Sequence, residues 1–223
     1  MSALLNTNLS QTTLTVAARP SPLSRNQVKE IQSLLPNITL VPTWIKSYGD
    51  ADRSTSLRDL GQSDFFTREV DQAVLDGLCD IAVHSAKDLP ATLPEGLELI
   101  ALTKGVDPSD SLVLSEGSTL ESLKPESRIA TSSKRREEAC LQLRSDLQFC
   151  DVRGTIEERL ALLHTPGVSG VVIAEAALIR LGLESLNRIT LPGSTVPGQG
   201  QLAIVSRQDN TPIKSLFAPL DSR

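Results

Sequence analysis

The feature that most constrains the fold is an alternation of short β-branched runs with segments of helical periodicity. Runs at 14–18 and 38–45 alternate with segments in which apolar residues recur three or four positions apart. This alternation is typical of α/β proteins, in which helices cover the faces of a sheet. It resumes after the segment 105–108 (GVDP), which we interpret as a crossover into a second unit. A chain of 223 residues is long enough to bury the core of two such units.

The predicted elements follow from apolar spacing, capping residues and proline or glycine breaks. Strands are expected at residues 14–18, 38–45, 81–83, 97–102, 128–131, 149–152, 171–174 and 202–206. Helices are expected at residues 22–35, from Asp64 to Leu78 with Val70 and Val74 on its apolar face, in a short segment capped by Ser118 and Glu121, at 134–146, from Thr155 to Leu163, and at 175–181. The polar segment 46–63 is predicted to be a mobile loop.

The last predicted strand returns to the first unit, and this gives the domain organisation. Residues 1–104 together with 201–223 form the predicted first domain, and residues 105–200 form the second.

Composition and charge exclude several classes of function. The net charge is -5 and aromatic residues make up 3% of the chain, so neither a basic footprint nor stacking residues for a nucleic acid are present. The start of the chain, 1–13, lacks the basic and apolar runs of a signal peptide. No stretch reaches the roughly 20 apolar residues that span a membrane. We therefore expect a cytoplasmic protein that binds neither nucleic acid nor membrane, and a monomer.

Cysteine and histidine usage points to no metal site. The three cysteines form no C-x-x-C pair, which fits packed thiols in a reducing compartment. His84 and His164 are too few and too far apart for a zinc site, and His84 at a strand end is typical of a structural histidine.

Polar and cationic residues follow several of the predicted strands. In open α/β sheets, ligands bind outside the carboxyl ends of the strands, where helix N-termini add N–H donors. The residues expected there are Arg19, Ser21, Lys87, Asp88, Ser132, Ser133, Arg135, Arg136 and Arg153. Converging arginines suit carboxylates, because the guanidinium fork binds them bidentately.

Each of these segments also has a structural interpretation. Ser132 and Ser133 at a strand–helix junction could serve only as a cap. Arg135 and Arg136 alone would more often be a solvated helix face. Lys87 beside Asp88 could be a surface ion pair of little energetic value.

The functional interpretation is favoured because several motifs occur in one order. These are RPSPL at 19–23, GD at 49–50, HSAKDLP at 84–90, ATSSKRR at 130–136, RGT at 153–155 with Arg159, RLGL at 180–183 and PGQG at 197–200. Together they resemble the hydroxymethylbilane synthase (porphobilinogen deaminase) family, from about residue 14 to the end of the chain.

This resemblance implies two domains of the periplasmic-binding-protein type (type II) with crossing hinge segments and a site in the cleft. It also implies a reaction of tetrapyrrole biosynthesis. Four porphobilinogen units are joined head to tail, with loss of ammonia at each step, to give hydroxymethylbilane.

The resemblance further implies a role for each matching residue. Asp88 would be the catalytic carboxylate, which stabilises the positive charge that develops as ammonia leaves and handles protons. The residues implied to bind the dipyrromethane cofactor are Lys87, Ser85, Thr131, Ser132, Ser133, Arg135, Arg136, Gly154 and Thr155. Those implied to bind substrate are Arg19, Ser21, Phe66, Arg153, Arg159, Arg180 and Gln199. The loop 48–63 would act as a lid.

The sequence departs from the family pattern at the cofactor anchor. Family members usually carry a third, C-terminal domain with a loop cysteine that holds the dipyrromethane through a thioether. We expect that domain to be absent here, because the sequence ends at Arg223 and none of its cysteines has the Gly-Gly-Cys context. The cofactor could be held noncovalently, another cysteine could substitute, or the protein could only bind pyrroles. The alternative function is therefore a non-catalytic two-lobed protein that binds carboxylate-rich ligands.

Overall fold

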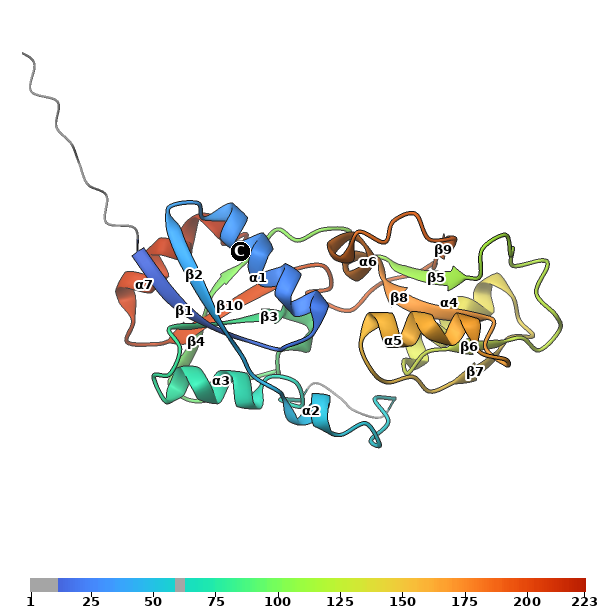
Figure 1. Ribbon diagram of the computed structural model, residues 1–223, viewed down its shortest axis with the longest axis horizontal. Coiled ribbons are helices and arrows are strands. Elements are labelled where there is room, and N and C mark those ends of the chain that lie inside the picture. Colours follow the sequence, from blue (N-terminus) through green and yellow to red (C-terminus); the bar gives the residue numbers. More distant parts are fainter. Residues whose placement is uncertain (1–11, 59–62) are drawn as a thin grey trace, which may run out of the picture.

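The computed structural model describes residues 12–58 and 63–223, and in these ranges the chain forms two lobes that lie side by side (Figure 1). Each lobe is built around one five-stranded mixed sheet of the described residues. The strand order is β2-β1-β3-β10-β4 in the first sheet and β7-β6-β8-β5-β9 in the second.

The first lobe contains the beginning and the end of the described chain. Its elements are β1 (Thr12–Ala18), α1 (Pro22–Leu34), β2 (Ile38–Trp44), α2 (Tyr48–Ala51), α3 (Arg68–Leu75), β3 (Ile81–Ser85), the 3₁₀ helix η1 (Ala86–Asp88), β4 (Leu97–Leu102), β10 (Leu202–Arg207), α7 (Thr211–Phe217) and η3 (Ala218–Leu220).

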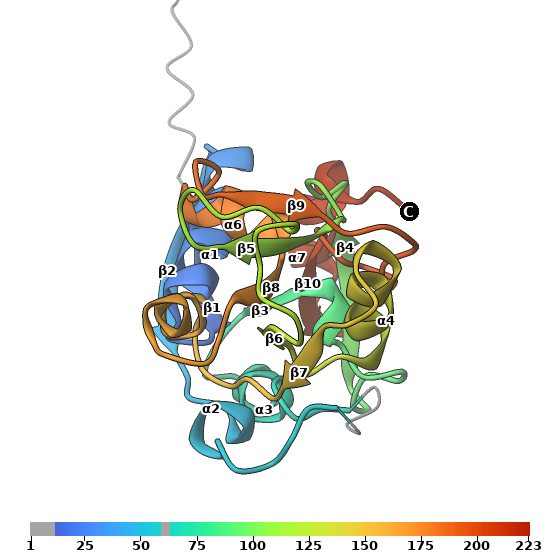
Figure 2. The ribbon, with the colours of Figure 1, turned by 90° about the vertical axis from the view of Figure 1, so that its right-hand side faces the viewer.

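The second lobe is continuous in sequence. Its elements are β5 (Asp110–Leu114), β6 (Arg128–Ala130), α4 (Lys134–Leu143), β7 (Gln148–Cys150), α5 (Ile156–Leu160), η2 (Ala161–His164), β8 (Gly170–Ala174), α6 (Glu175–Leu181) and β9 (Arg188–Thr190). In the end-on view these strands lie in front of those of the first lobe (Figure 2).

The two sheets share one topology. In each sheet, three neighbouring strands are parallel and the next strand across the sheet is antiparallel to them. This antiparallel strand is β10 between β3 and β4 in the first sheet, and β5 between β8 and β9 in the second. In both cases it is the first strand after the chain has crossed from the other lobe. The chain therefore crosses between the lobes twice, before β5 and before β10.

The inner strands β3, β10, β5 and β8 are almost wholly buried on both faces of their sheets, whereas the edge strands β2, β7 and β9 carry exposed residues. In β1, Val16 packs beneath α1 and α7 with Ile31 and Phe217, whereas the next residue, Ala17, faces α3 and packs with Val74. In the second lobe one face packs against α4 and the other against α5 and α6. Both sheets thus lie between helices, and only the ends of their strands are left uncovered.

Glycine is required where the two crossings meet. Val106 N donates to the carbonyl oxygen of Gly200 at 3.1 Å, so the two segments are in backbone contact. Gly200 has φ +86, and a side chain there would collide with the Val106 carbonyl oxygen. A Cβ at Gly105 would lie 2.9 Å from the Gly200 oxygen. Neither position can hold a larger residue without moving the crossing.

Most predicted elements are present, with ends shifted by a few residues. All eight predicted strands occur, and α1 begins as expected, with the Ser21 hydroxyl accepting from Ser24 N. Thr155 and Glu158 form the predicted capping box of α5. Strands β5 and β9 and helix α7 were not predicted from the sequence.

Four predictions were wrong in detail. The segment at Ser118 forms turns, because Thr119 and Ser122 bond to each other instead of capping a helix. The helix expected from Asp64 begins at Arg68, and Leu78 lies beyond its end with 70% exposure. The helix expected to reach residue 146 ends at Leu143.

The fourth correction concerns the predicted loop 46–63, which contains α2. This short helix forms because Ser47 and Asp50 make a capping box and because Gly49 packs directly against the rings of Phe65 and Phe66. Residues 59–62 of the predicted loop lie outside the described residues.

We propose that the domains divide as the sequence predicts, at residues 104/105 and 200/201. The proposal is supported by the sheet topology, because β1 to β4 and β10 form one sheet and β5 to β9 form the other.

No helix in the described ranges is long and apolar enough to cross a membrane. The same part of the chain contains no group of three or more His, Cys, Asp or Glu side chains placed to hold a metal ion.

The crossing yields a stability prediction. We expect Gly200→Ala to lower the free energy of unfolding more than Gly193→Ala, although both glycines have φ near +90. Gly193 has open space around it, so its substitution costs only the left-handed strain of about 1–2 kcal/mol. At Gly200 the collision with Val106 adds roughly 1–3 kcal/mol. Urea unfolding of both variants measures the difference, and equal losses would contradict the close crossing.

Candidate active site

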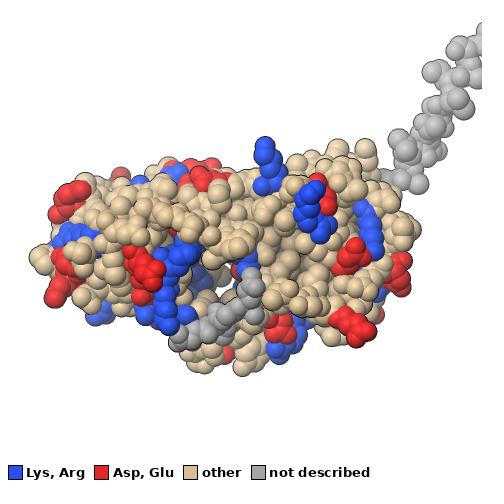
Figure 3. Space-filling view, turned by 180° about the vertical axis from the view of Figure 1, so that it is seen from behind, with Lys and Arg blue, Asp and Glu red and all other residues tan. Residues whose placement is uncertain are grey.

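A cleft of about 600 Å³ lies between the lobes. Seen from behind, the molecule is hollowed between the lobes, and Lys and Arg side chains gather at the edge of the hollow (Figure 3). The cleft is lined where β1, β3 and β8 end and where α1, α4 and α5 begin. This is the carboxyl edge of both sheets, where ligands bind in open α/β folds.

The first lobe contributes the wall that carries the predicted catalytic carboxylate. Arg19 follows β1, and Ser21 caps α1. Lys87 and Asp88 lie on η1 directly after β3, and both side chains line the cleft. The order of strand and short helix therefore presents Asp88 to the cleft.

The second lobe contributes the start of two helices. Ser132 and Ser133 lie between β6 and α4, whose first turn carries Arg135 and Arg136. Arg153, Gly154 and Thr155 lead into α5, which carries Arg159. Residues from these segments that line the cleft are Ser132, Ser133, Arg135, Arg136, Arg153, Gly154, Thr155 and Arg159.

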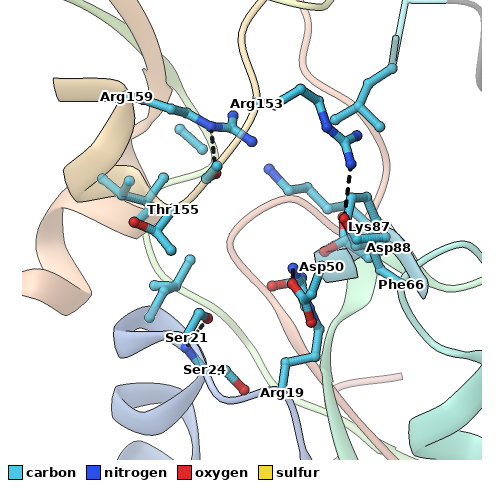
Figure 4. Close-up of a pocket in the computed structure, with 18 of the residues that line it drawn as sticks. Arg19, Ser21, Ser24, Asp50, Phe66, Lys87, Asp88, Arg153, Thr155 and Arg159 are labelled. Atoms are coloured by element: carbon cyan, nitrogen blue, oxygen red, sulfur yellow. Dashed lines mark hydrogen bonds and ion pairs between the residues drawn. The ribbon is translucent and has the colours of Figure 1, made fainter. Parts of the chain in front are cut away.

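The close-up shows labelled cationic side chains of both lobes around one open space (Figure 4). Arg153 and Arg159 of the second lobe lie on one side of this space. Arg19 and Lys87 of the first lobe approach it from the other sides, and Asp88 lies beside Lys87. A ligand in this space would meet positive charge from both lobes.

Arg19 is held in place by a carboxylate and an aromatic ring. Its Nε donates to both Asp50 oxygens, at 3.1 and 3.2 Å, and its Nη2 also pairs with Asp50. Its guanidinium carbon lies 4.5 Å from the centre of the Phe66 ring. Burial alone would raise the pKa of Asp50, but the hydrogen bond and charge of Arg19 outweigh it and lower that pKa.

Arg153 connects the second lobe to α2. Its Nη2 donates to the carbonyl oxygens of Gly49 at 2.8 Å and Asp52 at 2.5 Å. Its Nη1 is buried and has no partner among the described residues. A buried guanidinium N–H without a partner is costly, and an acceptor that reaches it would remove this cost.

A further contact between the lobes is the ion pair between Arg53 and Glu158, 2.9 Å apart. With Arg153, it connects α2 and the residues that follow it to the second lobe.

Burial and neighbouring positive charges lower the pKa values of two cleft residues. Burial, and then repulsion from Arg136, lowers the pKa of Lys87 to about 8. Burial, and then repulsion from Arg136 and Arg153, lowers the pKa of Arg159 to about 10. Both shifts have the signature of cations gathered in a site that favours an anion.

Arg135 and Arg136 both donate to the carboxylate of Asp110. Arg135 also donates to the carbonyl oxygen of Ser194 at 2.9 Å, yet its buried Nε has no partner among the described residues. This is a second available guanidinium donor at the cleft.

Most predicted site residues are brought together, and two are not. Thr131 is 1% exposed and is not part of the cleft wall. Arg180 instead joins the lobes, because it pairs with Glu30 of α1 at 2.6 Å and donates to the carbonyl oxygen of Gly200. The structure therefore places Arg180 away from the predicted substrate site. The remaining predicted residues, Ser85, Phe66 and Gln199, line the cleft.

The sequence analysis missed cleft residues on α1. Ser24 and Gln27 line the cleft, and Gln27 Nε2 donates to Ser85 Oγ at 2.8 Å. They lie three and six positions after Ser21, so helical spacing from that predicted residue could have found them.

The cysteines lie away from the cleft. Cys79 and Cys140 are buried, and Cys150 is partly buried in β7. None of them belongs to the described cleft wall. Burial raises the pKa of Cys140 to about 12 and also raises that of Cys150, so neither thiol is activated.

Comparison with known proteins identifies the family. Residues 14–215 match the sequence model described as "Porphobilinogen deaminase, dipyromethane cofactor binding domain". The chain belongs to the porphobilinogen deaminase family. Its similar relatives include porphobilinogen deaminase of Caldicellulosiruptor saccharolyticus, 39% identical with 93% of this chain and 73% of the relative covered. That of Roseiflexus sp. is 36% identical, with 95% and 72% covered.

Solved structures agree with the predicted type II periplasmic-binding-protein fold of this porphobilinogen deaminase family member. The methionine-binding protein MetQ matches with a TM-score of 0.56 and 13% identity, over 89% of this chain and 84% of MetQ. A periplasmic substrate-binding protein of an ABC transporter from Coxiella burnetii matches with a TM-score of 0.55 and 13% identity, over 93% and 91%. At such low identity, these similarities concern the fold alone.

The lowered pKa of Lys87 gives a testable titration. Because the pKa is about 8, the amine is protonated below that pH and becomes a nucleophile above it. We expect amine labelling of Lys87, followed by mass spectrometry from pH 6 to 10, to reach half its maximum near pH 8. Arg136→Gln should move this midpoint upward, because it removes the neighbouring positive charge that lowers the pKa of Lys87 most. A wild-type midpoint near the ordinary pKa of lysine would contradict the lowered pKa of this side chain.

Proposed function

We propose that this chain is a hydroxymethylbilane synthase, which joins four porphobilinogen units head to tail with release of ammonia. The observation that carries the proposal is a cleft that both lobes line with Arg and Lys side chains and whose wall also contains the carboxylate of Asp88. Porphobilinogen carries an acetate and a propionate group, which match guanidinium donors. Family membership supplies the reaction.

The cleft residues divide between two ligands in this proposal. Substrate carboxylates bind residues at the ends of β1, α2 and the crossing before β10 and on α5, and these are Arg19, Ser21, Phe66, Arg153, Arg159 and Gln199. The carboxylates of the dipyrromethane cofactor bind around η1 and the starts of α4 and α5, at Ser85, Lys87, Ser132, Ser133, Arg135, Arg136, Gly154 and Thr155. Thr131 and Arg180 are left out, because neither lines the cleft.

Asp88 acts on the protons and charge of the reaction. When the carbon–nitrogen bond of the substrate breaks, ammonia leaves with the bonding electron pair and the pyrrole becomes electron-poor. A carboxylate beside the pyrrole N–H stabilises this positive charge. After the new carbon–carbon bond forms, the attacked ring loses the proton from its α-carbon, and Asp88 is placed to accept it. The cationic walls fix the carboxylates of the ligand, so the rings meet in one orientation.

The donor set of the cleft fits the dipyrromethane cofactor. Lys87, Arg135 and Arg136 supply cationic donors, and the unpartnered Nε of Arg135 is available to an added acceptor. When bound, this group supplies the pyrrole carbon to which the first substrate unit is joined. No cysteine lies in the described cleft wall, and we propose that the residues of this wall hold the group by ion pairs and hydrogen bonds.

We further propose that the protein works as a cytoplasmic monomer on a small-molecule substrate. Its net charge of -5 and its three free thiols support this proposal.

The first prediction tests the catalytic role. We expect Asp88→Asn to reduce the rate of porphobilinogen consumption by roughly 10²–10⁴-fold while porphobilinogen still binds, because the amide keeps the shape but cannot accept a proton. Asp209→Asn, at a side chain that is 87% exposed, should match the wild type. Steady-state turnover and calorimetric binding separate the two effects. Wild-type binding without any turnover would instead indicate a non-catalytic binding protein.

The second prediction tests how the cofactor is held. Under denaturing conditions the chain should show its bare mass of 24.0 kDa, whereas native mass spectrometry should show an added dipyrrole. Ehrlich's reagent should colour the small-molecule fraction released on denaturation and leave the protein uncoloured. A pyrrole mass that remains on the denatured chain would contradict noncovalent binding.

A further inference from the structure

A buried carboxylate lies behind the arginines of the cleft. Asp110 is the first residue of β5, directly after the first crossing, and it is 1% exposed. It does not belong to the cleft wall, so the proposed site does not include it. A fully buried carboxylate is costly unless donors surround it.

Three side chains donate to Asp110. Arg135 Nη2 pairs with Oδ2, Arg136 Nη2 pairs with Oδ1 at 2.6 Å, and Gln199 Nε2 donates to Oδ1 at 2.9 Å. Burial alone would raise the pKa of Asp110, but the charge and hydrogen bonds of Arg136 and Arg135 outweigh it and lower that pKa. The carboxylate therefore stays charged near neutral pH.

Gln199 extends this cluster to the first lobe. Its Oε1 accepts from Lys87 Nζ at 3.3 Å, while its Nε2 also donates to the carbonyl oxygen of Pro108 at 2.6 Å. Pro108 lies on the first crossing and Gln199 precedes β10 on the second. The contacts thus run from Lys87, beside Asp88, through Gln199 to Asp110 and its two arginines.

We propose that Asp110 is a positioning residue that holds Arg135 and Arg136 as a preformed pair and, through Gln199, ties this pair to Lys87. The proposal rests on the proposed function, since it names what orients the donors of that same site. Side chains ordered before a ligand arrives lose less entropy when it binds. One buried negative charge also reduces the repulsion between two adjacent guanidinium groups, while leaving Arg135 Nε available.

The test compares two nearly isosteric variants. Asp110→Asn removes the charge behind the cleft. Glu175→Gln is the matched control, because Glu175 is also buried at 7% exposure and pairs with an arginine of the same lobe, Arg188, at 2.8 Å. Neither Glu175 nor Arg188 belongs to the described cleft wall.

Binding of porphobilinogen, measured by calorimetry at pH 7, is the first readout. We expect Asp110→Asn to weaken binding about tenfold, the scale of one lost charge-assisted contact, and Glu175→Gln to stay within about twofold. Urea unfolding monitors the stability of both variants. Equal effects of the two variants on binding, or no effect of Asp110→Asn, would overturn the proposal.

Titration of Lys87 by amine labelling is the second readout, and it needs no ligand. The charged groups that act on Lys87 are Arg136, Asp88, Asp110 and Arg159, and of these Asp110 and Asp88 raise its pKa. Asp110→Asn should therefore move the labelling midpoint below pH 8, whereas Glu175→Gln should leave it in place. A purely structural role would not shift this midpoint in that direction, so an unchanged midpoint would also overturn the proposal.

The two readouts separate this inference from the proposed function. If wild-type protein neither binds nor consumes porphobilinogen, the proposed function fails, and the Lys87 midpoint still decides whether Asp110 acts on the cleft. If Asp110→Asn does not fold, Gln199→Met takes its place, because it removes the hydrogen bonds of Gln199 to Asp110 and Lys87 and leaves the ion pairs of Asp110 intact. Its readout is the Lys87 titration, since Gln199 is itself a proposed substrate residue. Loss of the acceptor of Lys87 Nζ should lower the labelling midpoint, and an unchanged midpoint would contradict the coupling.

Discussion

Repulsion between like charges in one cleft is the constraint on which the rest of the site depends. Two unit charges 4 Å apart repel by about 4 kcal/mol at an effective dielectric constant of 20. The chain as a whole is acidic, with a net charge of -5, yet it gathers arginines and a lysine from both lobes around one space. Burial, and then repulsion from neighbouring arginines, lowers the pKa values of Lys87 and Arg159. A ligand that carries carboxylates relieves the repulsion, so selectivity for such ligands follows from the charge of the cleft.

The protein reduces this repulsion by placing a hydrogen-bond acceptor next to the cations of each lobe. Asp50 neutralises Arg19 in the first lobe, and Asp110 offsets one of the two positive charges of an arginine pair in the second. Arg153 instead uses the backbone carbonyl groups of α2. These acceptors occupy only part of each guanidinium, which leaves donors on Arg135 and Arg153 without partners. The arrangement is stable enough to fold and still incomplete without a ligand.

The sequence predicted what depends on local spacing and missed what depends on distant partners. Strand ends followed by helix caps placed Asp88 and Ser132 at the cleft, because neighbouring residues determine that geometry. The strand β5 was missed, because its DSLVL run is buried on both faces and shows no alternation. Asp110 and Arg180 could not be assigned from sequence, since their partners lie far along the chain: Gln199 is 89 positions from Asp110, and Glu30 is 150 positions from Arg180. Charge alone does not tell whether an arginine meets a ligand or a carboxylate of the protein.

The position of β10 has a consequence for how the protein is made. Because β10 lies between β3 and β4, the first sheet stays in two parts until residues 202–207 have been synthesised. The second sheet needs only residues 110–190 and can form earlier on the ribosome. Of the two lobes, the N-terminal lobe is therefore completed later, and the edges of β3 and β4 that face β10 stay unpaired until then. The second crossing delivers both β10 and Gln199, so the strand that completes the first sheet follows directly on the residue that bonds Lys87 of one lobe and Asp110 of the other.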